Sequence, residues 1–308
     1  MEKQIFEQKL KKKVGYAEDA LKRHLPREKG LQKTVIEAMN YSLLAGGKRL
    51  RPVFMWETYR LFGGEPGPEI EAFMAAIEMI HTYSLVHDDL PAMDNDEYRR
   101  GKKTTWCVYG DAFGVLAGDG LLNYAFETAL GALEEALSGE EQKLQMVSRV
   151  SRALSVLAKK AGIFGMIGGQ TADIEAEKAE TVEMDTLMFI HEHKTAALIQ
   201  ASMMVGAILA GANEEQVADI EKCAYNIGIA FQIQDDILDV IGDSEELGKP
   251  VGSDAQNHKQ TYVTIKGLRE AKADVGRLSK EAVEILGSFG GDCEFLTELI
   301  MELIHRRK

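Results

Sequence analysis

The chain has 308 residues and carries 36 lysines and arginines against 49 aspartates and glutamates, a formal net charge of −13. Such an acidic protein has no excess of basic side chains to displace the counterions of a nucleic acid, which excludes nucleic-acid binding as its main role. The hydrophobic content of 45% is enough for a sizeable core, and the three cysteines form no CxxC pair and no zinc-binding pattern.

Helical patterns dominate the chain, and the alternating patterns of strands are scarce. The expected helices cover residues 1–24, 31–44, a segment opened by 48–52, 69–90, 111–136, 141–161, 163–178, 183–212, 214–241, 261–287 and 292–304. The polar stretch 242–260 is expected to be a long functional loop. No composition shift marks a boundary, so residues 1–308 are expected to form a single all-α domain.

The most apolar segment, residues 196–212, is marginal in length for a membrane span and contains Gln200. It is therefore expected to be a buried helix of a large bundle. The first residues lack the apolar core of a signal peptide, and the sparse cysteines suit a reducing compartment. A cytoplasmic protein without integral membrane contact is expected.

One stretch concentrates acidic side chains at the end of a long helical pattern. Four aspartates crowd into positions 88–96, and Arg99 and Arg100 follow at once. Such a cluster repels itself unless a cation neutralises it, and carboxylate oxygens suit Mg²⁺ above all. The two arginines would repel a metal but suit a phosphate held by that metal. The stretch predicts a metal-bridged phosphate site, with a solvated acidic helix end as the alternative.

A second acidic group ends another apolar helix, at residues 235–239. Asp235 and Asp239 are four residues apart, so they lie roughly 40° apart around the helix and both can face one cation cluster. Asp236 would point about 100° away and is expected to make a supporting or loop contact. Negative charge at a helix carboxyl end is electrostatically unfavourable, so an accidental patch is a poor explanation.

Cationic segments supply the other half of a phosphate site. Residues 46–52 combine a flexible Gly–Gly backbone with fixed charges, and Lys194 is followed by the hydroxyl of Thr195. Lys249 and Lys259 lie on the polar stretch and could close over a bound phosphate. Each of these alone could be a solvated charge.

Taken together, these motifs resemble those of the trans-prenyl diphosphate synthases, specifically the bacterial farnesyl diphosphate synthase type. The matching segments are 46–52, 81–94 with 99–101, 168–173, 193–195, 231–239, 248–249 and 254–262. They follow the family order across about residues 30–265. The resemblance implies the family's isoprenoid-synthase helical bundle around a central cavity, and its usual homodimer.

The resemblance also implies the chemistry and the residues that carry it. An allylic diphosphate ionises, isopentenyl diphosphate attacks the cation, and a proton is lost. Mg²⁺ is the implied cofactor, bound as three ions together with the diphosphate. Mn²⁺ is an implied substitute for it. The implied metal ligands are Asp88, Asp89, Asp94, Asp235 and Asp239. The implied catalytic residues are Asp88, Asp89, Asp94, Arg99, Lys194, Asp235 and Lys259.

Substrate contacts are implied in two groups. The residues implied to bind the allylic diphosphate are Arg99, Lys194, Lys249 and Lys259, with neutral hydrogen bonds from Thr195 and Gln232. The residues implied to bind isopentenyl diphosphate are Gly47, Lys48, Arg51, His81 and Arg100.

Product length is expected to depend on the helix that carries Asp88. Tyr83 and Ser84 lie five and four residues earlier, one turn deeper on roughly the same face. The bulky side chain of Tyr83 would form the floor of the cavity that holds the growing product chain. This floor favours a C15 product, farnesyl diphosphate. The insertion of Pro91 and Ala92 also occurs in plant-type geranylgeranyl enzymes, so a C20 product stays open.

Three alternatives to an active prenyl diphosphate synthase differ from it in the motifs that they need. Terpene cyclases lack the second aspartate motif and the Gly-Gly-Lys-Arg element, and silent partner subunits usually lose one aspartate motif. A di-iron carboxylate bundle is suggested by two Glu-x-x-His pairs, Glu78 with His81 and Glu302 with His305. Such a site would leave the aspartates and the cationic clusters without a role.

Overall fold

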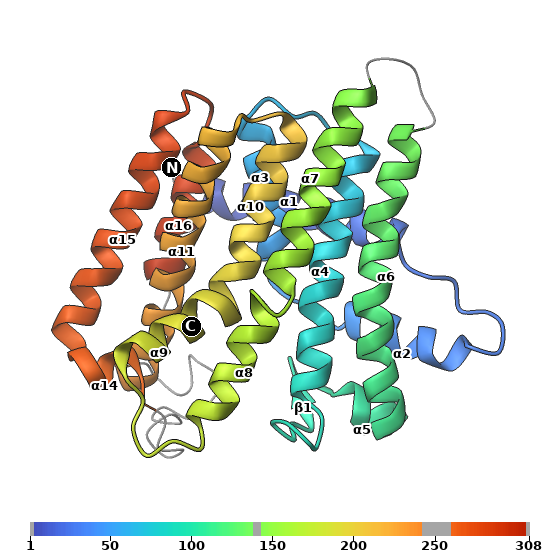
Figure 1. Cartoon of the computed structure of the whole chain (residues 1–308), viewed down its shortest axis with the longest axis horizontal. Coiled ribbons are helices and arrows are strands. Elements are labelled where there is room, and N and C mark those ends of the chain that lie inside the picture. The colour runs from blue at the N-terminus through green and yellow to red at the C-terminus, as the bar shows by residue number, and fades with distance from the viewer. Residues whose placement is uncertain (1–2, 138–142, 242–259, 306–308) are drawn as a thin grey trace. The chain divides into compact units, whose positions relative to one another are not determined.

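The computed structural model describes residues 3–137, 143–241 and 260–305, which are helical almost throughout (Figure 1). The all-α class expected from the sequence is confirmed. These residues divide between two compact units, an amino-terminal unit of 3–56 and 64–154 and a carboxy-terminal unit of 57–63 and 155–305. The expectation of a single domain stays a prediction. Apart from Gln260, the polar stretch 242–260 lies outside the described residues.

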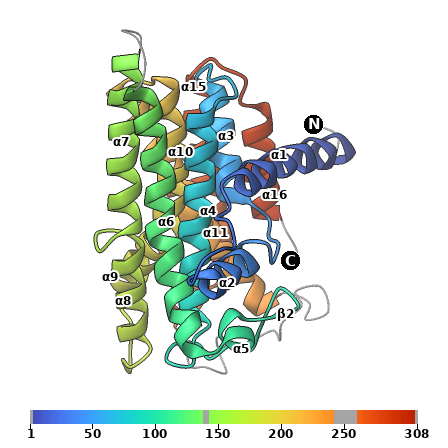
Figure 2. The same ribbon diagram turned by 90° about the vertical axis from the view of Figure 1, so that its right-hand side faces the viewer.

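The amino-terminal unit is built around a pair of long helices. Its elements are α1 (Lys3–Arg23), α2 (Lys33–Leu43), the start of α3 (Leu50–Leu61), α4 (Pro68–Asp88), β1 (Tyr98–Arg99), β2 (Lys102–Lys103), α5 (Thr105–Tyr109), α6 (Asp111–Leu137) and the first part of α7 (Lys143–Ala161). Helix α4 packs along α6, α1 lies on α4, and α2 contacts both. The hairpin and α5 lie at the carboxyl end of α4 (Figures 1 and 2).

Small side chains let α4 and α6 approach closely. Helix α6 buries a stripe of small residues at helical spacing, including Ala117, Ala125, Ala129 and Ala132. Helix α4 is buried on nearly every side from Ile70 to Val86. A helix that is apolar all round belongs inside a bundle, so α4 forms a rigid support for the aspartates at its end.

The carboxy-terminal unit is centred on α11. Its elements are α8 (Met166–Ala176), α9 (Met184–Ile190), the π-helix η1 (His191–Ala196), α10 (Ala197–Ala210), α11 (Glu214–Ile241), α14 (Tyr262–Lys266), α15 (Leu268–Ser288) and α16 (Glu294–His305). Helix α11 packs against α10, α15 and η1. A core cluster that includes Ala196, Ile233 and Val275 joins η1, α11 and α15.

Three features differ from the expected helices. The segment 183–212 is interrupted by η1, and the segment 261–287 is divided at Gly267, whose φ of +85° separates α14 from α15. The hairpin of β1 and β2 was not expected. Helix α10 is buried along nearly its whole length, as predicted for the apolar segment. In the described part of the chain, no helix combines the length and the apolar character that crossing a membrane requires.

Candidate active site

The first aspartate motif sits where α4 ends and the chain doubles back. Asp88 is the last residue of α4, and the backbone N–H of Asp94 donates to the carbonyl of Asp88 at 2.8 Å. The N–H of Asp96 donates to the carbonyl of Asp89 at 3.1 Å. The turn at 90–93 thereby returns the chain to the helix end. It brings Asp94 next to Asp88, although six positions separate them in the sequence.

Asp89 has a different environment from its neighbour. Its carboxylate is 4% exposed and accepts a hydrogen bond from Nε of Arg99 at 2.6 Å. Burial raises the pKa of Asp89, with Asp96 and Asp94 adding to the rise while Arg99 opposes it. In this arrangement Asp89 holds Arg99. A direct metal contact of Asp89 stays a prediction.

The hairpin β1–β2 presents two arginines, Arg99 at the end of β1 and Arg100 in the two-residue turn. Arg100 and Gly101 have φ values of +53° and +74°, as a tight hairpin turn requires. The carbonyl of Asp96 accepts hydrogen bonds from Oγ1 of Thr104 at 2.8 Å and from the indole N–H of Trp106 at 2.9 Å. These bonds fasten the hairpin to the aspartate loop. The indole of Trp106 therefore has a polar role in this loop.

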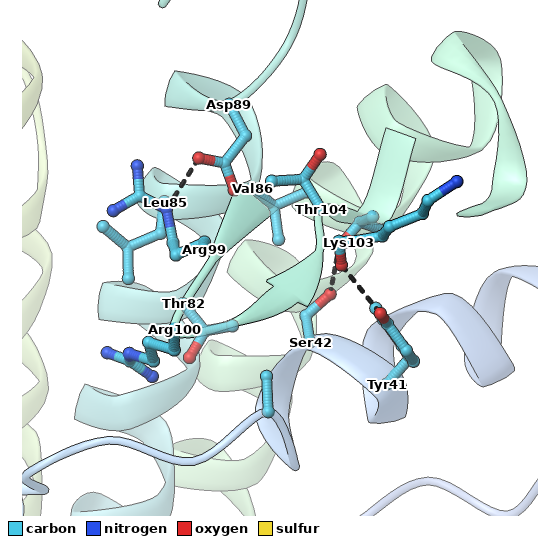
Figure 3. Close-up of a pocket in the computed structure, with 12 residues that line it drawn as sticks. Tyr41, Ser42, Thr82, Leu85, Val86, Asp89, Arg99, Arg100, Lys103 and Thr104 are labelled. Atoms are coloured by element: carbon cyan, nitrogen blue, oxygen red, sulfur yellow. Dashed lines mark hydrogen bonds and ion pairs between the residues drawn. The ribbon is translucent and has the colours of Figure 1, made fainter. Parts of the chain in front are cut away.

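A small cavity lies beneath this hairpin, between α2 and α4. Its volume is about 30 Å³, which suits a water molecule rather than a substrate. Figure 3 shows the guanidinium groups of Arg99 and Arg100 on the same side of the hairpin but apart from each other. This placement agrees with the expectation that the two arginines could serve different phosphates.

Arg100 also reaches the Gly–Gly loop after α2. It donates a hydrogen bond to the carbonyl of Gly46. Gly47 has a φ of +143°, and a Cβ on it would lie 2.7 Å from Nη1 of Arg100. Position 47 therefore needs glycine for its backbone conformation, and a larger residue would also displace the guanidinium of Arg100 from this place.

Four arginines gather around His81, and we call this set with His81 the arginine cluster: Arg49, Arg51, Arg99 and Arg100. The pKa of His81 lies well below its usual value because the ring is buried and because all four arginines add positive charge. Burial lowers the pKa of Arg51 to about 10, with Glu78 opposing the shift and Arg100 adding to it. Concentrated positive charge that is partly withdrawn from solvent calls for a multivalent anion.

Glu78 is the buried counter-charge of this cluster. Its carboxylate lies 2.6 Å from Nη1 of Arg49, and both side chains are 3% exposed. Arg49 also donates to the carbonyl of Leu43 at 2.7 Å, so the pair fixes the cationic loop to α4 and α2. A carboxylate committed to arginine, beside a histidine surrounded by four arginines, is a poor iron ligand. The di-iron interpretation of Glu78 and His81 is wrong.

Tyr83 lies one turn before the aspartates, as expected, and is 6% exposed. Its ring contacts His87 edge-on, with 5.9 Å between the ring centroids. Burial raises the pKa of Tyr83 to about 12, and the charge of Asp88 adds to the rise. The phenol is therefore neutral at physiological pH. The hydroxyl of Ser84 donates to the carbonyl of His81 at 2.9 Å and so faces its own helix.

The second aspartate motif ends α11 in the carboxy-terminal unit. Asp235 accepts a hydrogen bond from Nε2 of Gln232 at 3.4 Å, and Asp239 is buried one turn further on. Asp236 points elsewhere and accepts the backbone N–H of Tyr262 at 2.7 Å. The loop contact expected for Asp236 from helix geometry is confirmed.

Lys194 and Thr195 lie in the π-helix η1. Such local widenings of a helix are rare and frequently occur at functional sites. Nζ of Lys194 lies 2.5 Å from Oδ2 of Asp173, a buried residue of α8. The π-helix therefore presents a lysine whose position is held by a buried carboxylate.

Two glycines make room for the π-helix. A Cβ on Gly169 of α8 would lie 2.1 Å from the backbone nitrogen of Lys194. A Cβ on Gly228 of α11 would lie 2.3 Å from Cβ of Ala196. These approaches show that η1 is packed tightly against α8 and α11, through tertiary contacts that the local sequence does not reveal.

The described residues fit Mg²⁺ as one component of a phosphate site. No group of three or more His, Cys, Asp or Glu side chains in the described ranges is arranged to hold a metal ion by itself. Mg²⁺ is usually bound by one or two carboxylates together with phosphate oxygens and water. The pairing of Asp94 with Asp88 and the shared helix face of Asp235 and Asp239 suit that arrangement. Lys249 and Lys259 lie outside the described residues.

Named relatives match this chain over most of its length. The farnesyl diphosphate synthase of Geobacillus stearothermophilus is 45% identical over 266 residues, 86% of each chain. That of Bacillus subtilis is 44% identical over 263 residues, 85% of this chain and 86% of its own. A chloroplastic geranylgeranyl pyrophosphate synthase of Capsicum annuum is 46% identical over 253 residues, 82% of this chain and 66% of its own.

Solved structures share the fold. An FPP/GFPP synthase from Zymomonas mobilis, an apo structure, is 30% identical with a TM-score of 0.82, covering 97% of this chain and 98% of its own. A geranyltransferase from Helicobacter pylori, complexed with magnesium and isoprenyl diphosphate, is 31% identical with a TM-score of 0.78, covering 96% and 95%. The family model described as polyprenyl synthetase matches residues 32–287. The resemblance seen in the motifs is confirmed, and the chain belongs to the polyprenyl synthetase family.

Proposed function

We propose that this chain is a farnesyl diphosphate synthase, a prenyltransferase that joins isopentenyl diphosphate head to tail with dimethylallyl and then geranyl diphosphate. Two bacterial relatives of that name, which match over most of the chain, support this. The observation that carries the proposal is the arginine cluster beside an aspartate motif. A reaction with two diphosphate substrates needs two anion sites, whereas a terpene cyclase needs one.

The reaction breaks the allylic C–O bond, and the bonding electrons leave with the diphosphate. The double bond of isopentenyl diphosphate then forms the new C–C bond, and a proton passes to the departing diphosphate. Bound Mg²⁺, three ions in our proposal, would supply the positive charge that a diphosphate leaving group needs. Both aspartate motifs serve this purpose, with Asp88, Asp94 and Asp235 as principal ligands and Asp239 assisting.

Basic side chains add charge stabilisation at the allylic diphosphate. We assign this role to Arg99, Lys194 and Lys259, with Lys249 closing from the polar stretch. Two of them are held by buried carboxylates, Arg99 by Asp89 and Lys194 by Asp173. Such pre-orientation lets a charge act without reorganising at the moment of reaction. Thr195 and Gln232 supply neutral hydrogen bonds.

The arginine cluster binds isopentenyl diphosphate. Arg51 and Arg100 provide charge, and Lys48 adds an exposed cation from the Gly–Gly loop that Gly47 keeps open. His81 has a lowered pKa, so its imidazole is neutral at physiological pH. It therefore donates a hydrogen bond rather than a further charge.

The C15 product follows from Tyr83. Its buried, neutral ring lies one turn from the aspartates on α4, where the growing chain would extend, with Ser84 beside it. Geranylgeranyl diphosphate synthase is the second candidate, since plant enzymes of that name are as similar to this chain as the bacterial farnesyl enzymes are.

We also propose a cytoplasmic homodimer. The exposed side of α6 carries Leu116, Leu130 and Leu137, each a multiple of seven residues apart, with Asn123 in the same series. Apolar residues at this spacing suit pairing with another helix, and a polar residue in such a seam favours one register. A second copy of this chain is the occupant we propose, and sedimentation at micromolar concentration tests it.

Incubation with isopentenyl diphosphate, Mg²⁺ and either dimethylallyl or geranyl diphosphate tests the activity. We expect C15 farnesyl diphosphate from both primers. A C20 product would favour the second candidate, and no product from either primer would exclude both.

A further inference from the structure

Asp236 lies between two residues assigned to Mg²⁺, yet its surroundings differ from theirs. Its Oδ2 accepts the backbone N–H of Tyr262, the first residue of α14, at 2.7 Å. The same oxygen lies 3.9 Å from Nε2 of His191, the first residue of the π-helix. One carboxylate on α11 thus contacts the two elements that flank the second aspartate motif.

The N–H of Tyr262 is one of the donors that a helix start cannot satisfy within the helix. Thr261 and Thr264 satisfy others by a reciprocal pair of side-chain hydrogen bonds, which defines the start of α14. Just before it, Oε1 of Gln260 accepts the N–H of Val182 at 2.6 Å. The start of α14 is therefore fastened residue by residue, and Asp236 supplies the bond from α11.

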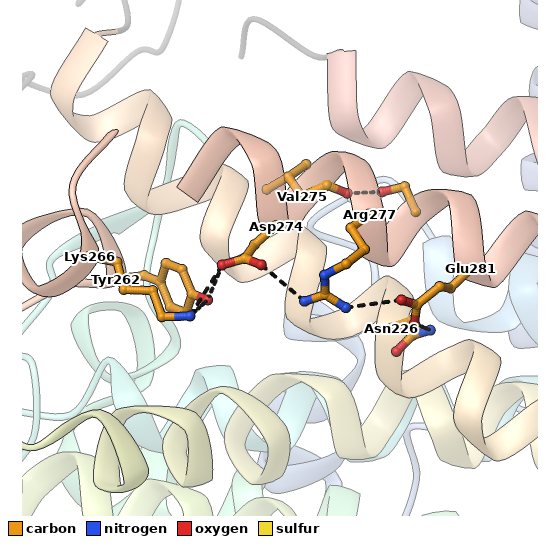
Figure 4. A network of polar contacts seen from close by, with 8 residues as sticks. Asn226, Tyr262, Lys266, Asp274, Val275, Arg277 and Glu281 are labelled. Carbon is orange, nitrogen blue, oxygen red and sulfur yellow. Dashed lines mark hydrogen bonds and ion pairs between the residues drawn. The ribbon is translucent and has the colours of Figure 1, made fainter. Parts of the chain in front are cut away.

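The rest of α14 is held by a separate network (Figure 4). The hydroxyl of Tyr262 donates to Oδ2 of Asp274 at 2.7 Å. Nζ of Lys266 donates to that hydroxyl at 2.9 Å and lies 3.2 Å from Asp274. This network joins α14 to α15, whereas Asp236 joins α14 to the helix that carries Asp235.

We propose that Asp236 is a positioning residue that fixes the start of α14 against the second aspartate motif, rather than a metal ligand. The consequence rests on the proposed function, in which Lys194 of the π-helix acts on the allylic diphosphate. His191, which Asp236 also approaches, begins that π-helix three residues before Lys194. The anchor at Asp236 therefore limits where Lys194 can act.

Two variants at this position separate the roles. Asp236→Asn keeps an oxygen that can accept the Tyr262 N–H, whereas Asp236→Ala removes the acceptor. We expect the Asn variant to stay within about threefold of wild-type kcat/KM, since the positioning bond is kept. Loss of a hydrogen bond to a charged group changes the equilibrium constant that depends on it by about tenfold or more. We therefore expect the Ala variant to raise the KM for geranyl diphosphate by about tenfold.

The Mg²⁺ concentration for half-maximal rate provides the second readout. It should be unchanged in both Asp236 variants and should rise in Asp235→Asn, the comparison for a true ligand. Hydrogen exchange of the peptide spanning 262–266, measured without substrate or Mg²⁺, provides a third. Exchange there should be faster in Asp236→Ala and not in Asp236→Asn. Glu281→Ala, in the α15 network but away from α14, should change none of these.

A raised Mg²⁺ requirement in Asp236→Asn would overturn the proposal and make Asp236 a ligand. Wild-type exchange at 262–266 in a folded Asp236→Ala protein would overturn it as well. If Asp236→Ala does not fold, the Asn variant alone decides between the two roles. The exchange measurement needs no activity, and a wild-type enzyme that forms no product would instead count against the proposed function.

Discussion

Gly169→Ala gives a sharp test of the π-helix. The added Cβ would lie 2.1 Å from the backbone nitrogen of Lys194 and 2.6 Å from the carbonyl carbon of His193. Ordinary contact begins near 3.4 Å, so α8 or the π-helix must move by about 1 Å or more. Backbone atoms cannot rotate away as a side chain can, and overpacking of this kind costs about 1–3 kcal/mol.

The measured quantities follow from that shift. An unfolding entropy of about 2.1 cal/mol/K per residue makes 2 kcal/mol equivalent to about 3 °C in Tm for a chain of 308 residues. A displacement of about 1 Å at a catalytic group can cost about 100-fold, so we expect kcat to fall by one to two orders of magnitude. Calorimetry and product formation from geranyl diphosphate measure the two effects.

Gly276→Ala is the matched control. It lies in the same unit, within α15, and its Cβ would meet nothing within 4 Å. Replacing a helical glycine at an open position stabilises by roughly 0.5–1 kcal/mol, so Tm should rise slightly and kcat should not change. A Gly169→Ala enzyme with wild-type kcat would refute the reasoning that this glycine positions Lys194.

Three further predictions concern the amino-terminal unit. Glu78→Gln should lower the free energy of unfolding by about 3–5 kcal/mol, because it removes the buried negative charge opposite Arg49, whose buried guanidinium then donates to uncharged acceptors; a calorimetric loss under 1 kcal/mol would refute this. Tyr83→Ala should lengthen the product from C15 toward C20 by chromatography while Tyr83→Phe keeps C15, and unchanged C15 from the Ala variant would remove Tyr83 as the floor. Because folded His81 binds a proton less readily than the unfolded chain, its contribution to stability is complete above the usual pKa of 6.5 and is lost as the pH falls below it. His81→Gln should therefore flatten the decline in Tm between pH 6.5 and 5, and an unchanged decline would count against a buried neutral imidazole.

The helices were predictable because local signals mark their ends. Pro68 begins α4, one residue before the expected start at 69, and Pro91 follows the end of the helix at Asp88. The division at Gly267 was missed because a single glycine inside a helical pattern does not by itself indicate a break. The hairpin had a signal in the turn residues Arg100 and Gly101, but strands of two residues are too short to show an alternating pattern.

The site was only partly readable from the sequence. The divergence of Asp235 and Asp236 follows from helix geometry and was predicted correctly. Asp88 and Asp89 look alike in the sequence, and only burial and the contact with Arg99 separate them. Asp173, as the partner of Lys194, was missed because this pairing depends on how α8 packs against the π-helix.

Product analysis of the purified wild-type enzyme is the most direct test of whether this chain is a farnesyl diphosphate synthase. With isopentenyl diphosphate, Mg²⁺ and dimethylallyl or geranyl diphosphate, we expect farnesyl diphosphate as the main product and no turnover when Mg²⁺ is chelated. Failure to form a prenyl diphosphate from either primer would contradict it.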